Sequence, residues 1–372
     1  MKFLEEYRDP QLAEQYLNRL HSVTTGEWVI MEFCGGQTHS LVKNGLIDLL
    51  PAGVTMVHGP GCPVCVTPLS MIDAAIRLAE EKGVILCSFG DMLRVPGSSQ
   101  NLLEAKAKGA AVRFFYSPME AVELARKHPD REVVFFAVGF ETTAPANALS
   151  VLYAKRLGLK NYSLLTSHVL VPPAISAIVE DEEVCVDGFL GAGNVCSVMG
   201  LKEYEQLIDR YNKPLVVTGF EPVDLLQGIL MTVTQLERGE SKLENQYSRV
   251  VPYEGNPEAQ AAVYEVFERC DREWRGIGVL PGSGLQVTEE YAGFDAIRKF
   301  GLTFRYVAEP SACMAGEILK GTKKPVDCPH FGTTCTPENP LGAPMVSSEG
   351  ACAAYYHFRA ICSADSHPIR TF

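Results

Sequence analysis

The sequence predicts an α/β protein with parallel sheets, followed by a smaller loop-rich region. Between residues 28 and 240, short runs of β-branched and aromatic residues alternate with helical stretches, and this alternation is typical of βαβ units. Most of the runs are continuously apolar, as strands covered on both faces require. After residue 240, charged, Gly-rich and Pro-rich segments replace the alternation. We therefore expect two α/β domains and a third domain without a large core.

The expected elements follow one another along the chain. The first 20 residues predict an amphipathic helix, in which charged residues alternate with Leu and Tyr. The expected strands are Trp28–Phe33, Thr55–His58, Val84–Phe89, Val112–Tyr116, Val133–Val138, Tyr162–His168, Val186–Leu190 and Pro214–Thr218. The expected helices are Leu41–Leu50, Ser70–Glu81, Glu120–His128, Ala146–Leu157, Leu201–Tyr211 and a last one near Pro257–Cys270.

A recurring motif favours two sheets over one large sheet. The segment Val138–Thr142 (VGFET) returns as Thr218–Pro222 (TGFEP), and each copy ends a strand and begins a helix. We place the two α/β domains at 21–117 and 118–240, and the third domain at 241–372, joined by the N-terminal helix 1–20. The chain of 372 residues, 47% of them hydrophobic, is long enough for several cores.

Composition and charge argue against several functions. The formal net charge is −12 and no Lys/Arg-rich block is present, which argues against nucleic acid and against an anionic membrane surface as partners. We find no signal peptide and no apolar stretch of transmembrane length, so we expect a cytoplasmic protein, monomeric by itself. The Gly-rich turns match neither G-x-G-x-x-G with a later acidic residue nor the P-loop, so no nucleotide cofactor is indicated.

Twelve cysteines are unusual for a cytoplasmic protein of this size. Disulfide frameworks are rare in that compartment, so metal binding or thiol redox chemistry is the better interpretation. Four isolated cysteines are interpreted as buried packing residues or inert thiols, and these are Cys87, Cys185, Cys196 and Cys270. The remaining eight fall into two regions.

Cys34 begins the first region, directly after the strand Trp28–Phe33 and before a helix. Open α/β sheets bind ligands at the carboxyl ends of their strands, and a helix N-terminus favours a thiolate. Two glycines after Cys34 allow a ligand to come close. His39 is a candidate proton carrier or an outer partner of a bound metal. Taken alone, Cys34 could equally be a packing residue.

Cys62 and Cys65 form a C-x-x-C motif in a Gly-Pro-Gly turn after the next expected strand. Two cysteines at that spacing can close a disulfide or share a metal. A packing role is the weaker interpretation, because such a turn is a poor place to bury a side chain. Adjacent parallel strands would bring these two thiols close to Cys34.

Two further loops leave strands at the same expected edge. Phe89–Gly97 carries Asp91 and Arg94, and Gly139–Pro145 carries Glu141. These charged side chains are candidates for proton transfer or electrostatic stabilisation in a cleft between domains. Helix capping or a surface ion pair is an equally good interpretation of each.

The second region holds Cys313, Cys328, Cys335 and Cys352, with 14, 6 and 16 residues between successive members. Four thiolates suit a cubane iron–sulfur cluster or a Cys₄ zinc site, and the spacing does not choose between them. We expect His330 to lie outside the ligand set and Cys362 to be a non-ligand.

Together these segments resemble the HypD family of hydrogenase maturation factors. The matching segments are Cys34–His39, Gly59–Cys65, Phe89–Gly97, Gly139–Thr143, Gly219–Gly228 and the tail from Cys313 through Cys352. The resemblance implies two Rossmann-like domains and a mainly helical third domain with a [4Fe–4S] cluster. It also implies an accessory assembly protein rather than a metabolic enzyme.

The resemblance further implies partners and residue roles. With HypC and HypE, the family assembles an iron that carries cyanide and carbon monoxide, which HypC takes to the hydrogenase large subunit. Cys34 would bind that iron, Cys62 and Cys65 would form a redox-active pair, and the cluster would reduce the pair. The implied cluster ligands are Cys313, Cys328, Cys335 and Cys352. This chain departs from the family pattern at Gln37 and Asn194, where some relatives carry histidine, so the role of the Asn194 loop is in doubt.

Two other functions fit parts of the pattern. A stand-alone thiol–disulfide oxidoreductase with a cluster as electron donor would use the C-x-x-C motif but would give Cys34 no iron to bind. A structural zinc protein that serves only as an assembly platform would use the four C-terminal cysteines alone. Infrared bands of metal-bound cyanide and carbon monoxide would support the iron-assembly function over the oxidoreductase. Brown colour and thiolate-to-iron charge-transfer absorbance would exclude the zinc protein.

Overall fold

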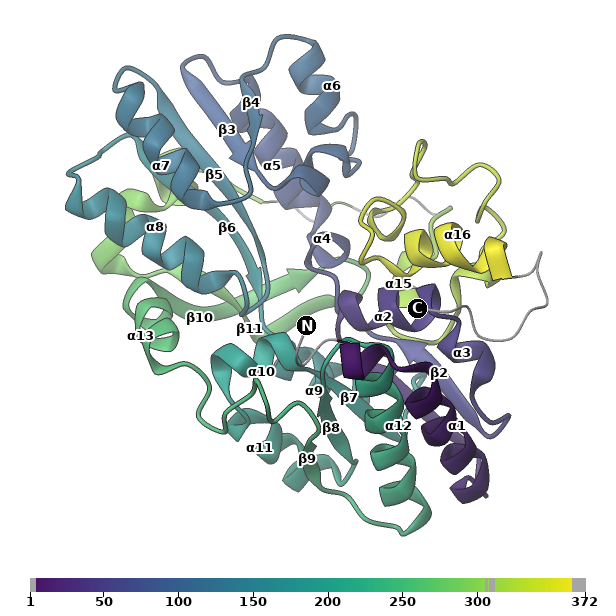
Figure 1. The fold of residues 1–372 in the computed structure, drawn as a ribbon. Coiled ribbons are helices and arrows are strands. Elements are labelled where there is room, and N and C mark those ends of the chain that lie inside the picture. The colour runs from purple at the N-terminus through teal and green to yellow at the C-terminus, as the bar shows by residue number, and fades with distance from the viewer. Residues whose placement is uncertain (1–4, 305–306, 308–311, 363–372) are drawn as a thin grey trace.

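The computed structural model describes residues 5–304, 307 and 312–362, and it contains two β-sheets that lie side by side with helices around both (Figure 1). The helical elements are η1 (Glu5–Arg8), α1 (Pro10–Val23), α2 (Gly35–Lys43), α3 (Leu46–Leu49), α4 (Pro63–Val66), α5 (Leu69–Glu80), η2 (Gly90–Arg94), α6 (Leu102–Ala107), α7 (Pro118–Lys127), α8 (Ala144–Arg156), α9 (Val171–Glu180), α10 (Gly193–Met199), α11 (Lys202–Tyr211), α12 (Pro222–Glu237), α13 (Pro257–Val266), η3 (Glu289–Phe294), α14 (Ala296–Lys299), α15 (Ala315–Leu319), η4 (Pro325–Asp327), η5 (Ala343–Met345) and α16 (Ala351–Cys362).

Sheet A has five parallel strands in the order β2-β1-β7-β8-β9. They are β1 (Trp28–Glu32), β2 (Val54–His58), β7 (Gly188–Ala192), β8 (Leu215–Thr218) and β9 (Leu243–Asn245). Side chains of α1, α2 and α12 pack on one face of this sheet, and side chains of α9, α10 and α11 pack on the other. Two covered faces explain why its central strands are continuously apolar.

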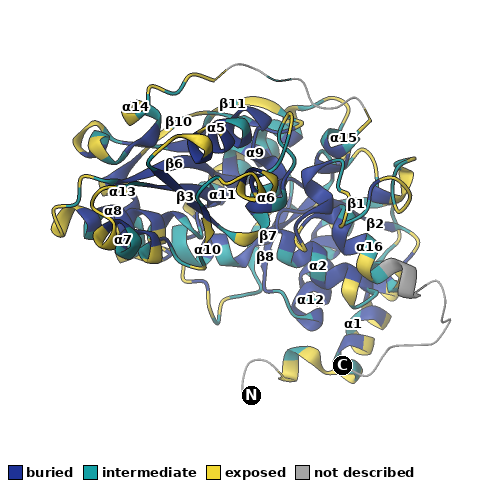
Figure 2. Cartoon of the chain, turned by 90° about the horizontal axis from the view of Figure 1, so that it is seen from above, coloured by how far each residue is buried: buried dark blue, intermediate teal, exposed yellow. Residues whose placement is uncertain are grey.

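Sheet B has six strands in the order β10-β11-β6-β5-β3-β4. Four are parallel, β3 (Val84–Ser88), β4 (Val112–Phe114), β5 (Glu132–Gly139) and β6 (Tyr162–Val169), whereas β10 (Phe267–Trp274) and β11 (Gly278–Val287) form an antiparallel hairpin beside β6. Helices α7, α8 and α13 cover one face, and α5, α6 and α14 cover the other. Seen from above, the central strands of both sheets are buried, and the exposed positions lie on the surrounding helices and loops and on the outer strands β4, β10 and β11 (Figure 2).

The α/β class, the two sheets and all eight expected strands are confirmed. The helix expected over Leu41–Leu50 is interrupted at Gly45, whose φ of 64° ends α2 and begins α3. The last expected helix stops at Val266. Cys270 therefore lies in β10, the edge strand of sheet B, whose charged side chains are mostly exposed or half-buried. The sequence analysis did not predict β9, β10 or β11.

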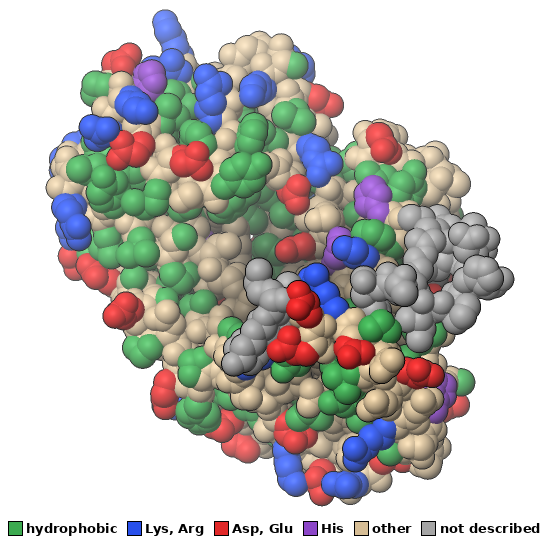
Figure 3. Space-filling view, viewed as in Figure 1, with side chains coloured by type: hydrophobic (Ala, Val, Ile, Leu, Met, Phe, Trp, Pro, Cys, Tyr) green, Lys and Arg blue, Asp and Glu red, His purple; other side chains and the backbone are tan. Residues whose placement is uncertain are grey.

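The two sheets are interleaved along the chain. Sheet A pairs β1 and β2 with strands that come after residue 117, and β9 joins it from beyond residue 240. The domain boundaries at 117 and 240 stay predictions. No helix in the described part of the chain has both the length and the apolar character to cross a bilayer. Acidic and basic side chains are interspersed over the face seen in Figure 3.

Candidate functional site

Each sheet has a topological switch point, where the connections that leave two adjacent parallel strands lead toward opposite edges of the sheet. In sheet A, the strand β1 has β2 on one side and β7 on the other, so a crevice opens at the carboxyl ends of β1 and β7. Cys34 follows β1 and Asn194 follows β7, and their Sγ and Oδ1 atoms are 3.7 Å apart. In sheet B, the equivalent loops follow β3 and β5 and carry Asp91 and Glu141.

Cys34 is the N-cap residue of α2, in extended backbone conformation, and its side chain is 7% exposed. Burial raises the pKa of its thiol to about 12, and the nearby Glu349 carboxylate adds to the rise. The expected stabilisation of a thiolate by the helix N-terminus is therefore outweighed. A bound metal ion would reverse this balance, because a coordinating thiol is deprotonated outright.

The loops of Cys34 and of the C-x-x-C motif are in direct backbone contact. The Gly35 amide donates a hydrogen bond to the Gly61 carbonyl over 3.0 Å, and a Cβ atom on Gly61 would overlap the backbone of Phe33 and Cys34. Only glycine allows this approach. The structure therefore brings the two cysteine loops together, as the order of strands predicted.

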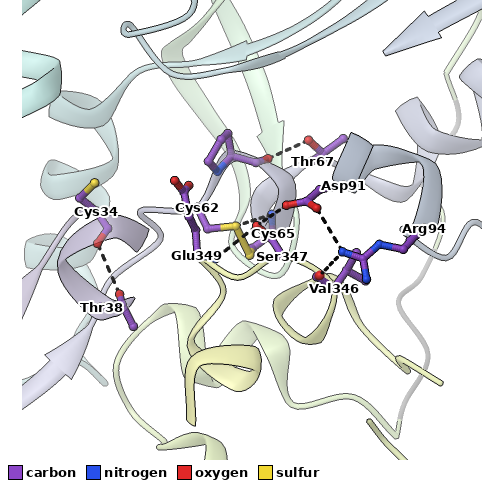
Figure 4. Close-up of a disulfide and its surroundings, with 11 residues drawn as sticks. Cys34, Thr38, Cys62, Cys65, Thr67, Asp91, Arg94, Val346, Ser347 and Glu349 are labelled. Carbon is purple, nitrogen blue, oxygen red and sulfur yellow. Dashed lines mark hydrogen bonds and ion pairs between the residues drawn. A yellow bond between two sulfur atoms is a disulfide. The ribbon is translucent and has the colours of Figure 1, made fainter. Parts of the chain in front are cut away.

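Cys62 and Cys65 form a disulfide across the four-residue helix α4, with a Cα–Cα distance of 5.2 Å. Both side chains are buried, so the expectation that this turn would not bury its side chains is wrong. The disulfide packs in the same apolar cluster as Cys34 and Phe140. Figure 4 shows it between Cys34 on one side and Asp91 on the other, with Glu349 beside it.

A loop from the C-terminal region, 346–350, closes over these cysteines. The Ser347 hydroxyl donates to Asp91 Oδ2 over 2.8 Å, and Arg94 donates to the Val346 carbonyl over 2.8 Å (Figure 4). His39 Nδ1 donates to the Ser348 carbonyl over 3.2 Å. Asp91, Arg94 and His39 thus all hold one loop, which is their observed structural role.

That loop places Glu349 against the start of α2. A Cβ atom on Gly35 would lie 2.5 Å from the Glu349 Cβ and carbonyl oxygen. Desolvation, followed by the Asp91 carboxylate, raises the pKa of Glu349. Gln37 anchors the same helix from the opposite side, because its Nε2 donates to the Gly191 carbonyl over 3.1 Å and to the Thr218 hydroxyl over 2.7 Å.

Glu141 is buried at the N-terminus of α9. Its Oε1 accepts a hydrogen bond from the Val171 amide over 2.8 Å, and burial raises the pKa of its carboxyl to about 8. This is the capping interaction that the sequence offered as the alternative. A catalytic role of Glu141 stays a prediction.

The four C-terminal cysteines line one small apolar pocket, whose other walls include Phe331, Leu341, Pro344 and Met345. A Cβ atom on Gly342 would overlap the Cys313 sulfur, and the Leu341 amide donates to the Cys335 sulfur over 3.4 Å. Burial and the three other thiols raise the pKa of Cys352. Four thiols therefore border one small apolar pocket.

This donor set fits a cubane cluster. Among the described residues, no three His, Cys, Asp or Glu side chains are arranged to hold a single metal ion, but a cubane attaches each thiolate to a different iron and needs only a shared pocket. His330 also lines the pocket, and its Nδ1 is hydrogen-bonded to the Thr334 hydroxyl over 2.8 Å. The Cys362 side chain lies outside the described residues, so its role stays a prediction.

The sequence analysis missed two buried ionisable residues beneath Cys34. Glu32 is the last residue of β1 and His58 is the last residue of β2, and their side chains are 2.8 Å apart. The signal was present in the sequence, because an ionisable residue ends each of two mainly apolar strands that precede the cysteine loops. It also missed that Ser347 and Glu349 lie against the cysteine loops.

Comparison with known proteins gives full-length matches. The family model HypD, described as the hydrogenase formation hypA family, matches residues 11–359. The hydrogenase maturation factor HypD of Azotobacter vinelandii is 50% identical over 367 residues, which cover 96% of this chain and 97% of that protein. The corresponding protein of Rhodobacter capsulatus is 47% identical over 370 residues (96% and 98%), and that of Escherichia coli K12 is 46% identical over 367 residues (96% and 98%). The similarity therefore spans both sheets and the C-terminal pocket.

Proposed function

Because the chain belongs to the HypD family of hydrogenase maturation factors, we propose that it builds the iron unit of a nickel–iron hydrogenase, Fe(CN)₂CO. In this proposal the chain works with HypC and HypE, and HypC carries the finished unit to the hydrogenase large subunit. The observation that carries the proposal is the meeting of Cys34 with the Cys62–Cys65 disulfide at the switch point of sheet A.

Cys34 is the proposed ligand of the iron substrate. Iron(II) that acquires cyanide and carbon monoxide is well matched by a soft thiolate donor. Binding would release the thiol proton, and the apolar surroundings of Cys34 would then keep water from the bound metal. The Asn194 carboxamide lies beside the Cys34 sulfur. It could therefore form a hydrogen bond with a cyanide ligand of the bound iron.

The Cys62–Cys65 pair is the proposed two-electron donor for releasing cyanide. When HypE presents cyanide as a thiocyanate on one of its own cysteines, the S–C bond must break. That cleavage takes two electrons, and closing the disulfide between Cys62 and Cys65 yields two electrons and two protons. Cyanide then passes to the iron, one proton goes to the freed partner thiolate, and the other goes to solvent.

Cys313, Cys328, Cys335 and Cys352 are the proposed ligands of a [4Fe–4S] cluster. A cluster at this place would supply electrons one at a time, and two such electrons with two protons from solvent would reopen the disulfide. The support comes from the chain itself: the four thiols line one apolar pocket, and the segment that ends in Cys352 also forms the loop over the disulfide.

Infrared spectroscopy of the protein purified anaerobically with HypC tests the proposal. We expect bands of metal-bound cyanide and carbon monoxide in the unaltered complex, no such bands after Cys34→Ser, and strongly weakened bands after Cys62→Ser. Cys185→Ser is the matched control, because Cys185 is exposed and has no role in the site, and it should leave the bands unchanged. Full bands in Cys34→Ser would contradict the proposal. Disulfide turnover without bands in any sample would instead favour a stand-alone thiol–disulfide oxidoreductase.

A further inference from the structure

A buried chain of hydrogen bonds runs beneath Cys34 and begins at Glu32. This carboxylate is fully buried. Its Oε2 accepts the Cys34 amide hydrogen over 2.9 Å, and its Oε1 accepts the hydroxyl hydrogen of Thr38, one turn into α2. Glu32 therefore holds the backbone of Cys34 and the first turn of the helix that follows it.

The chain continues through His58 to the C-terminal region. His58 Nδ1 is 2.8 Å from Glu32 Oε1, and His58 Nε2 is 3.0 Å from the Tyr355 hydroxyl. A nitrogen that faces a carboxylate carries the hydrogen, so Nδ1 donates to Glu32 and Nε2 is hydrogen-bonded to the Tyr355 hydroxyl. The rings of His58 and Tyr355 also pack edge to face, with centroids 5.4 Å apart.

Tyr355 connects this hydrogen-bond network to the C-terminal region, because it lies on α16, three residues after Cys352. Helix α16 also packs against α2, where the rings of His39 and Phe358 are in edge contact with centroids 5.0 Å apart. The helix that begins beside the C-terminal pocket therefore reaches the Cys34 backbone through two intermediate side chains.

The cost of leaving a buried carboxylate unsatisfied makes this linkage stiff. Glu32 has three donors in the structure, and losing one of them would expose part of the desolvation penalty of its charge. A displacement of Tyr355 would free His58 to turn, and the position of Glu32 and hence of Cys34 would then be less defined. Seating of α16 and order at Cys34 are thus coupled.

We propose that Tyr355, His58 and Glu32 are positioning residues that make the geometry of Cys34 depend on the seating of α16 beside the C-terminal cysteine pocket. The inference deepens the proposed function, on which it rests in taking Cys34 as the iron ligand. Its consequence is an order of events: Cys34 is fixed for iron only after the C-terminal pocket has been filled.

The alkylation rate of Cys34 by iodoacetamide, followed by peptide mass spectrometry, tests the linkage in the full chain. Tyr355→Phe removes one hydrogen bond and should speed alkylation about fivefold, because the buried thiol becomes exposed more often. Glu32→Gln should have a larger effect, about tenfold or more. Tyr356→Phe is the matched control on the same helix, since the Tyr356 ring contacts Phe331 and not this network. Equal rates in Tyr355→Phe, Tyr356→Phe and the unaltered chain would overturn the proposal.

A second measurement separates positioning from general loosening. We compare alkylation of the chain loaded with ferrous iron and sulfide with alkylation of the chelated chain. Removing iron should speed alkylation of Cys34 in the unaltered chain and in Tyr356→Phe, and should have little further effect in Tyr355→Phe. The same ratio in all three proteins would overturn the coupling. A normal ratio without infrared bands would retain the coupling and reject only the iron-binding role of Cys34.

Discussion

The two cysteine sites of this chain are supported in different ways. Cys34 and the Cys62–Cys65 disulfide follow β1 and β2, whose ladders in sheet A and covered faces fix the backbone that leads to them. The C-terminal cysteines lie in 312–352, where the described regular elements before α16 are α15, of five residues, and η4 and η5, of three residues each. The sheet fixes the backbone that leads to Cys34 and to the disulfide without a metal, and we propose that only the final order at Cys34 depends on α16. A pocket made of loops is expected to depend on its proposed ligand throughout.

The largest predicted effect concerns the C-terminal cysteine pocket, which has less regular structure than the site on sheet A. We expect Cys328→Ser, or chelation of the proposed cluster iron, to unfold the pocket segment 312–350 while both sheets stay folded, because structural zinc contributes about 10 kcal/mol to the folding of zinc-finger peptides. Limited proteolysis with mass spectrometry should show cleavage within 312–350 and protection of β1 to β8. Cys185→Ser should keep the unaltered cleavage pattern. Protection of the tail after complete chelation would contradict the prediction.

The second prediction tests the cysteine site on sheet A at its tightest backbone contact, where Gly61 meets Phe33 and Cys34. Gly61→Ala would push a methyl group into the backbone of Phe33 and Cys34, and overpacking against rigid backbone costs about 3 kcal/mol. Urea unfolding should show that loss of stability, and the rate at which Cys34 is alkylated should change with it. Gly293→Ala is the control, because the space around that position is open. Equal stability of the two variants would mean that the contact between the loops is softer than the structure indicates.

The same contrast explains how much of the molecule could be predicted from the sequence. Apolar runs identified strands β1 to β8, and parallel topology then placed Cys34 and the C-x-x-C motif at one edge. The hairpin of β10 and β11 was missed, because the first half of β10, up to Cys270, was interpreted as the end of the preceding helix. An edge hairpin with one face in solvent has no apolar run that would identify it.

The remaining misses come from contacts between distant segments. Glu32, His58 and Tyr355 belong to β1, β2 and α16, and no local pattern in the sequence relates them. The spacing of the four C-terminal cysteines likewise matches neither the compact ferredoxin run nor the paired C-x-x-C motifs of zinc ribbons, since irregular loops bring the thiols together. The sequence grouped these four cysteines, but only the resemblance to a family chose an iron–sulfur cluster over zinc, because the spacing could not. Function was thus easier to predict where regular structure carries the site.

The smallest predicted effect concerns Glu141, the buried acid at the edge of sheet B, and extends the comparison to that sheet. The native pKa of Glu141 is about 8 and lies above the ordinary value of 4.5. The folded chain therefore holds its proton longer than the unfolded chain, and the stability due to the neutral carboxyl is lost as pH rises from about 4.5 to about 8. Glu141→Gln should remove this loss. It should stabilise the chain by about 1–2 kcal/mol at pH 8, less than the full shift implies, because the new amide nitrogen stays unpaired.

Urea titrations between pH 5 and pH 8 measure how the free energy of unfolding changes with pH. Glu258→Gln, on the exposed first turn of α13, should leave this slope unchanged. A Glu141→Gln variant with the slope of the unaltered chain would contradict the capping interpretation of the buried acid. If the variant gains stability and still yields the infrared bands, Glu141 serves the fold and the proton chemistry belongs to the cysteine loops. If it gains stability and the bands disappear, the edge of sheet B has given up stability for a role in assembly, as strained functional sites commonly do.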